Sequence, residues 1–76
     1  MNPEIKVYAV WDDEAQVWSA TSDEVPGLAI EAGTMEELIK RLEVIIPELL
    51  ELNGQIPGPE IPFHLYSERV GVARVG

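Results

Sequence analysis

Apolar and polar residues alternate near the start of the chain. Every second position of residues 5–11 is apolar on the side that carries Ile5 and Trp11, and a period of two predicts a β-strand. Residues 12–15, three acids followed by Ala15, favour a turn, and residues 16–22 contain the strand formers Val17 and Trp18. Residues 5–22 are therefore predicted to form a β-hairpin, and Trp11 and Trp18 are expected to pair across it. A turn set by Pro26-Gly27 leads to a third, short strand over residues 28–32.

The pattern then changes to the period of a helix. Thr34 is a predicted N-cap, and Glu37 three positions later completes a capping box. Gly54 is the expected stop signal. The helix is therefore predicted over Met35–Leu52, with Pro47 inside it as a local bend on the polar face.

The apolar residues of this helix form two adjoining stripes, about 90° apart at 100° per residue. The first stripe consists of Leu38, Leu42, Ile45, Leu49 and Leu52, and the second of Met35, Ile39, Ile46 and Leu50. Both stripes could be buried in the small core of the chain itself. We favour a second subunit over the second stripe, because one helix has one sheet face to cover. Ile39, Ile46 and Leu50 are then the expected interface of a homodimer or higher oligomer. The alternative interface is an edge strand or the open sheet face, to which we assign Tyr8, Val10 and Trp18.

The proline-rich residues 55–62 predict a stiff connector, and residues 63–70 predict a last strand, which residues 71–76 extend or leave frayed. The expected fold class is α+β, in the order β-β-β-α-β, with one long helix packed on the sheet. A chain of 76 residues makes one domain over residues 1–76, with no separate DNA-binding domain.

The amino-acid composition limits the classes of molecule that the chain is expected to bind. The chain has 14 acidic and five basic residues and a net charge of −9, which argues against direct binding to nucleic acid or to an anionic membrane surface. The charge suits a basic protein partner, and it is equally compatible with solubility alone. With no cysteine, no basic N-terminal leader and no long apolar run, we expect a cytoplasmic protein without disulfides.

Few residues are candidates for chemistry. Asp12, Asp13 and Glu14 are clustered, but three adjacent turn residues point in different directions, so a solvated turn is favoured over a metal site. His64 is the one histidine, and alternation places it on the opposite strand face from Phe63, which favours an ordinary surface position. Phosphate-binding glycine loops, nucleophile elbows and metal-ligand spacings are absent from the sequence. We therefore expect neither an enzyme nor a cofactor.

The order of these elements resembles a known family. An acidic turn, an aromatic second strand, Glu24-Val25-Pro26-Gly27 before the third strand and Gly33-Thr34-Met35-Glu36-Glu37 at the helix start follow one another in residues 11–50. This pattern is similar to the HicB-like antitoxins, and in particular to their small stand-alone DUF1902-like members. The match covers half to two thirds of the chain, and its specificity lies in the order and spacing of the pieces.

The resemblance implies a partial RNase H-like fold, in which the fourth strand lies beside the first. It also implies that the chain binds and neutralises a small basic HicA-like toxin that cleaves RNA. Because the hairpin turn and the next loop both lie at sheet ends, the expected contacts to such a toxin are Asp12, Asp13, Glu14, Asp23 and Glu24. The alternative is a self-associating structural or small-ligand-binding module with no toxin partner.

Overall fold

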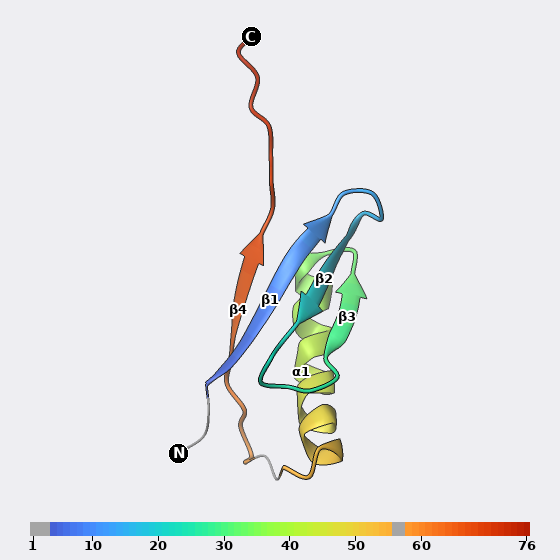
Figure 1. Ribbon diagram of the computed structural model, residues 1–76, viewed down its shortest axis with the longest axis vertical. Helices are drawn as coiled ribbons and strands as arrows, with labels where there is room; N and C mark the ends of the chain where they lie inside the picture. Colours follow the sequence, from blue (N-terminus) through green and yellow to red (C-terminus); the bar gives the residue numbers. More distant parts are fainter. Residues whose placement is uncertain (1–3, 56–57) are drawn as a thin grey trace.

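Over the part of the chain that the structure describes, the fold is α+β, with one mixed four-stranded sheet and one helix (Figure 1). The computed structural model describes residues 4–55 and 58–76. Residues 1–3, and residues 56–57 of the predicted connector, lie outside the described residues. The elements are β1 (Ile5–Asp12), β2 (Val17–Thr21), β3 (Ala29–Ala32), α1 (Met35–Leu52) and β4 (Phe63–Glu68). The sheet order is β3-β2-β1-β4; β1 pairs antiparallel with β2 and parallel with β4.

The predicted hairpin is present in β1 and β2. Trp11 and Trp18 are directly opposite each other, and their rings meet edge to face with centroids 5.4 Å apart, a favourable aromatic geometry. The turn closes through Gln16, which has a φ of 58°, a left-handed conformation that tight turns require. The guanidinium of Arg69, just beyond β4, lies 4.3 Å from the centroid of the Trp11 ring. The aromatic pair therefore connects the hairpin to the chain that leaves β4.

The helix begins and ends where the sequence predicts. The hydroxyl oxygen of Thr34 accepts a hydrogen bond from the backbone N–H of Glu37 at 3.1 Å, which satisfies one of the free donors of the first turn. After Leu52, Gly54 adopts a φ of 77°, as expected for a residue past a helix end. The side chain of Asn53 donates to the carbonyls of Pro26 (3.2 Å) and Leu49 (2.8 Å). The end of α1 is thus tied to the loop between β2 and β3.

The core lies between α1 and one face of the sheet. On the sheet side it contains Ile5, Val7, Ala9, Ala20 and Ala32, on the helix side Leu38, Leu42, Ile46 and Leu50, and from the β2–β3 loop Val25 and Leu28. The three alanines leave room for larger helix side chains. A helix over such small residues can bury a wide arc of its surface within one chain.

This packing corrects the assignment of the second helix stripe. Ile46 and Leu50 are only 1% and 5% exposed, so they belong to the core of the chain and cannot form an interface with another subunit. Ile39 is the one member of the predicted interface that reaches solvent, at 36% exposure. The prediction was wrong because it counted one stripe for one sheet face, whereas the small Ala9, Ala20 and Ala32 admit parts of both stripes.

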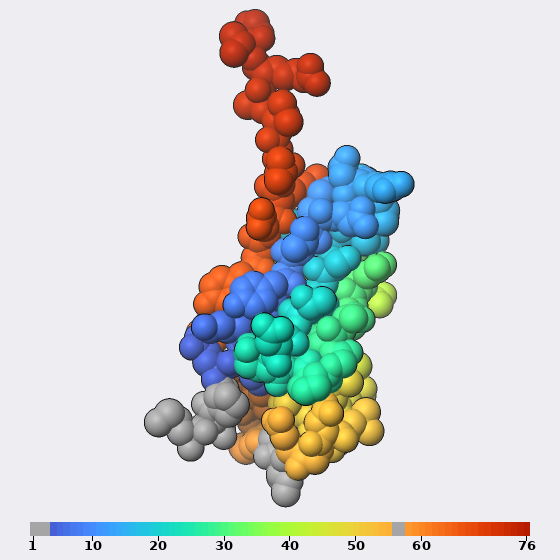
Figure 2. Space-filling view, in the orientation of Figure 1, coloured from blue at the N-terminus to red at the C-terminus, as the bar shows by residue number. Residues whose placement is uncertain are grey.

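The open face of the sheet also differs from its predicted composition. Tyr8 and Val10 are exposed on it, and Tyr66 of β4 lies beside Tyr8 with stacked rings 5.6 Å apart. Trp18 belongs to the other face, because it pairs with Trp11 and packs against the core. Alternation along β1 puts Trp11 on the same side as Val7. The open face, which Figure 2 shows, therefore carries two tyrosines and a valine.

Candidate functional site

The carboxylates of the hairpin turn are occupied by the turn itself. One oxygen of Asp12 accepts hydrogen bonds from the backbone N–H groups of Glu14 and Ala15, each at 3.1 Å. One oxygen of Asp13 accepts from the Trp11 indole N–H at 3.2 Å and from the Gln16 side chain at 3.3 Å. These bonds give Asp12 and Asp13 a structural role in shaping the turn.

In the second predicted acidic group, Asp23 and Glu24, one acid has a structural role and the other does not. One oxygen of Glu24 accepts a hydrogen bond from the backbone N–H of Lys6 at 2.7 Å, and the hydroxyl of Ser22 donates to the Lys6 carbonyl at 2.6 Å. These two bonds hold the β2–β3 loop against the start of β1. Asp23 lies next to them and is exposed, so it is the freer acid of the pair.

The structure does not bring the two acidic loops together. The β1–β2 turn and the β2–β3 loop lie at opposite ends of the sheet, because β2 separates them along its length (Figure 1). A small partner that contacts Asp23 directly is therefore at the far end of the molecule from Asp12, Asp13 and Glu14. The five acids make two separate surfaces.

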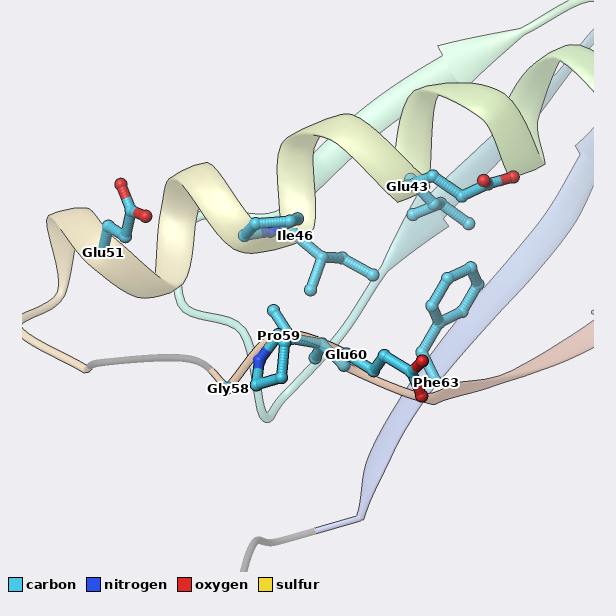
Figure 3. A pocket seen from close by; sticks show the side chains of 10 residues that line it. Glu43, Ile46, Glu51, Gly58, Pro59, Glu60 and Phe63 are labelled. Atoms are coloured by element: carbon cyan, nitrogen blue, oxygen red, sulfur yellow. The ribbon is translucent and has the colours of Figure 1, made fainter.

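A groove that sequence reasoning missed lies between α1 and the connector that precedes β4. Its volume is about 460 Å³. Apolar side chains form its floor and acidic side chains stand at its rim (Figure 3). The floor contains Leu42, Ile46, Pro47, Pro59, Ile61 and Phe63, and the acids are Glu43, Glu51 and Glu60.

The three acids are not equivalent. Glu43, Glu51 and Glu60 are all exposed, and Figure 3 shows Glu51 turned away from the connector, with Glu43 and Glu60 on the side of the Phe63 ring. An aromatic ring near carboxylates suits the end of an arginine or lysine, whose apolar stem covers the ring while its charge meets the acids. The groove can therefore receive a basic side chain.

This groove depends on residues that are far apart in sequence. The prolines of residues 55–62 predicted a stiff connector, but nothing local in the sequence predicts that Ile61 and Phe63 pack under Leu42 and Ile46. The usable signal was the acid at Glu60 within the proline-rich run, together with Glu43 and Glu51 on the polar side of the helix.

The remaining titratable candidates do not converge. The Nε2 atom of His64 lies 3.2 Å from a carboxylate oxygen of Glu4, and both side chains are about half exposed, at 54% each. Within residues 4–55 and 58–76, no three histidine or acidic side chains are grouped so as to hold a metal ion. Over the same residues, α1 lacks the length and apolarity with which a helix crosses a bilayer.

Comparison with known proteins gives a family and a structural relative. Residues 4–75 match the family described as "Domain of unknown function (DUF1902)". The crystal structure of the hypothetical protein TTHA1013 from the extremely thermophilic bacterium Thermus thermophilus is similar, with 49% identity and a TM-score of 0.70. That match covers 96% of this chain and 100% of the other. No curated protein matches.

Proposed function

This chain belongs to the DUF1902 family, and we propose that it is a non-catalytic, HicB-like antitoxin that binds and neutralises a small basic HicA-like toxin. The observation that carries the proposal is the charge of the surface. The sequence has 14 acids against five bases, and every charged side chain among the described residues lies outside the buried core. Such a surface attracts a basic protein and accelerates its encounter.

The arrangement of the elements supports the proposed relation to HicB-like proteins. The order β-β-β-α-β, with β4 parallel to β1 at one end of the sheet, is the arrangement that a partial RNase H-like fold calls for. Fold alone does not carry function; the acidic surface and the groove are the features that favour a toxin partner.

We place the direct contact at the end of the molecule that holds the groove and Asp23. The bond from Asn53 to Pro26 shows that the β2–β3 loop lies against the end of α1, so Asp23 and Glu24 are at the same end as the groove. An arginine or lysine of the toxin enters between Glu43 and Glu60. Asp12, Asp13 and Glu14 contribute from a distance, through the field that steers a basic partner.

The test is direct binding. The genes beside that of this chain are searched for a short basic HicA-like protein, which is titrated with the purified chain while its cleavage of RNA is followed. We expect a stable complex and loss of RNA cleavage. If the toxin cleaves RNA equally well with the chain in excess, the antitoxin proposal is wrong.

A second candidate function is supported by a different observation. The exposed Tyr8, Val10 and Tyr66 on the open sheet face suit a self-associating structural or small-ligand-binding module. In that case the chain forms oligomers but leaves the basic neighbour unbound and active.

A further inference from the structure

The part of the chain that follows β4 is an extended arm (residues 69–76). Figures 1 and 2 show it continuing the direction of β4 and standing clear of the body, except for the Arg69 guanidinium at its start, which lies over the Trp11 ring. Its valines Val70, Val72 and Val75 are 84%, 81% and 107% exposed. The molecule is 54 Å long but only 23 × 18 Å across, and its radius of gyration is 14.4 Å, against about 11 Å for a compact domain of this length.

Such an arm is poorly explained as a free end. Valine favours extended structure because its β-branched side chain packs well on a sheet. An isolated strand leaves its backbone hydrogen-bonding groups to water and gains nothing from its apolar side chains. Among the described residues, no strand pairs with residues 70–76. The arm therefore has the composition of a strand that needs a sheet edge.

The two edges of the sheet differ in how they are protected. β3 is four residues long and carries Glu31 near its centre, and short charged strands discourage pairing. β4 is six residues long, and its sequence FHLYSE contains neither proline nor lysine and has its one acid at the last position. An edge of this length and composition is open to a further strand. The β4 edge is the better acceptor for the arm.

We propose that the arm pairs antiparallel with the β4 edge of a second copy of this chain. The exchange is reciprocal, so the arm of the second copy pairs with the β4 edge of the first. Each copy supplies one arm and one edge, so a two-fold axis closes the pair without leaving a further arm or β4 edge free. Matching six residues of arm to the six residues of β4 puts Arg69 on the axis. The pairing needs no toxin, so it stands or falls separately from the antitoxin proposal.

The side chains agree with this register. Alternation places Tyr66 on the open face and Phe63 and Leu65 on the helix face. In the proposed pairing Tyr66 is opposite Val72 of the second copy, and Phe63 is opposite its Val75. Each of these apolar residues thus meets an apolar residue on the same face, as cross-strand pairs require. The pairs on the helix face are Phe63 with Val75, Leu65 with Ala73 and Ser67 with Gly71. The pairs on the open face are His64 with Arg74, Tyr66 with Val72 and Glu68 with Val70.

The charge of the arm favours a second copy of this chain, rather than a basic toxin, as its binding partner. The arm holds two of the five basic residues, Arg69 and Arg74, and none of the 14 acids. The rest of the chain is strongly acidic and attracts the arm, whereas a basic toxin repels it. In the proposed register Arg74 lies opposite His64, which is next to Glu4 in its own chain, so the arm's charge reaches an acid of the second copy.

Sedimentation or light scattering at tens of micromolar tests the pairing. We expect a mass of twice 8.4 kDa for the full chain, and the mass of a single shortened chain for a variant without residues 70–76. Circular dichroism should show both folded, because the arm stands outside the core. Val72→Glu in the full chain should also give the monomer. The matched control is Val44→Glu, which places the same change on an exposed valine of α1 and should leave the dimer intact.

The register has its own test, because the chain contains no cysteine. In Arg69→Cys the two new thiols stand directly opposite each other across the axis, where Cβ atoms are about 4.5–5.5 Å apart, so a small adjustment of the strands brings them to the separation of about 3.5–4.5 Å that a disulfide needs. We expect oxidation to give a cross-linked dimer. A dimer that does not cross-link overturns the register. A monomeric full chain, or a dimer that survives loss of residues 70–76, overturns the arm pairing. The arm pairing is also overturned if proteases cleave the arm in the chain alone and it becomes protected only when toxin is added.

Discussion

At the scale of single residues, burial decides what a substitution costs. Ile46 is 1% exposed and Val44, two positions earlier on the same helix, is 61% exposed. Ile46→Ala should lower the free energy of unfolding by about 2–5 kcal/mol, because it leaves a cavity among packed side chains. Val44→Ala should change it by less than about 0.5 kcal/mol. Urea denaturation of both variants at one protein concentration measures the difference. Equal costs would show that Ile46 is not in the core of the chain.

Thr34 gives a second prediction at this scale. Its hydroxyl oxygen accepts the backbone N–H of Glu37 at 3.1 Å. Thr34→Ala removes that acceptor and should cost about 1 kcal/mol of unfolding free energy. Thr34→Ser keeps the oxygen and should stay close to the parent chain. The same urea titration compares the three, and an alanine variant as stable as the serine variant would mean that the cap contributes nothing.

At the scale of elements, local signals were sufficient for most of the fold. The helix runs over Met35–Leu52 as predicted, because its cap, its period and its stop are all written within one segment. The strands begin and end within two residues of their predicted bounds for the same reason. The predicted Trp11–Trp18 pair is confirmed, since a hairpin turn fixes which residues face each other.

Features that depend on distant segments were not predicted. The burial of Ile46 and Leu50 follows from Ala9, Ala20 and Ala32, which lie on three different strands and open space under the helix only once the sheet forms. The groove likewise needs Ile61 and Phe63 to pack against α1. For residues 71–76 the sequence left two alternatives open, an extension of the last strand or a frayed end, and in the structure β4 ends at Glu68.

A prediction at the scale of elements concerns the stability of the hairpin turn. Asp12 accepts two backbone N–H groups of the turn, each at 3.1 Å. Asp12→Ala leaves both to water and should cost about 0.5–1.5 kcal/mol, with faster amide hydrogen exchange at residues 14 and 15. Glu14→Ala removes an exposed acid from the same turn and is the matched control, with stability near that of the parent. If both variants are equally stable, the Asp12 bonds do not hold the turn.

At the scale of the whole molecule, the charge of −9 and the groove make separable contributions to binding a basic toxin. The general field acts at a distance and is screened over about 8 Å at physiological ionic strength and about 3 Å at 1 M salt. A carboxylate in direct contact with a desolvated basic group is screened much less. If net charge alone determined binding, removal of any two acids would lower the affinity for the toxin by the same amount.

Two double variants with the same net charge separate these contributions. Glu43→Gln with Glu60→Gln changes the groove. Glu14→Gln with Glu36→Gln removes two exposed acids that do not line it, one in the hairpin turn and one in the first turn of α1. We expect toxin affinity to fall with added salt for every chain, because exposed acids far from the groove, such as Asp12 and Asp13, contribute through the field. At a single salt concentration the groove variant should bind at least tenfold more weakly than its control, which corresponds to about 1.4 kcal/mol. Isothermal titration at low and high salt measures both effects. Equal losses in the two variants would remove the groove as the contact site, and affinity independent of salt would remove the electrostatic attraction itself.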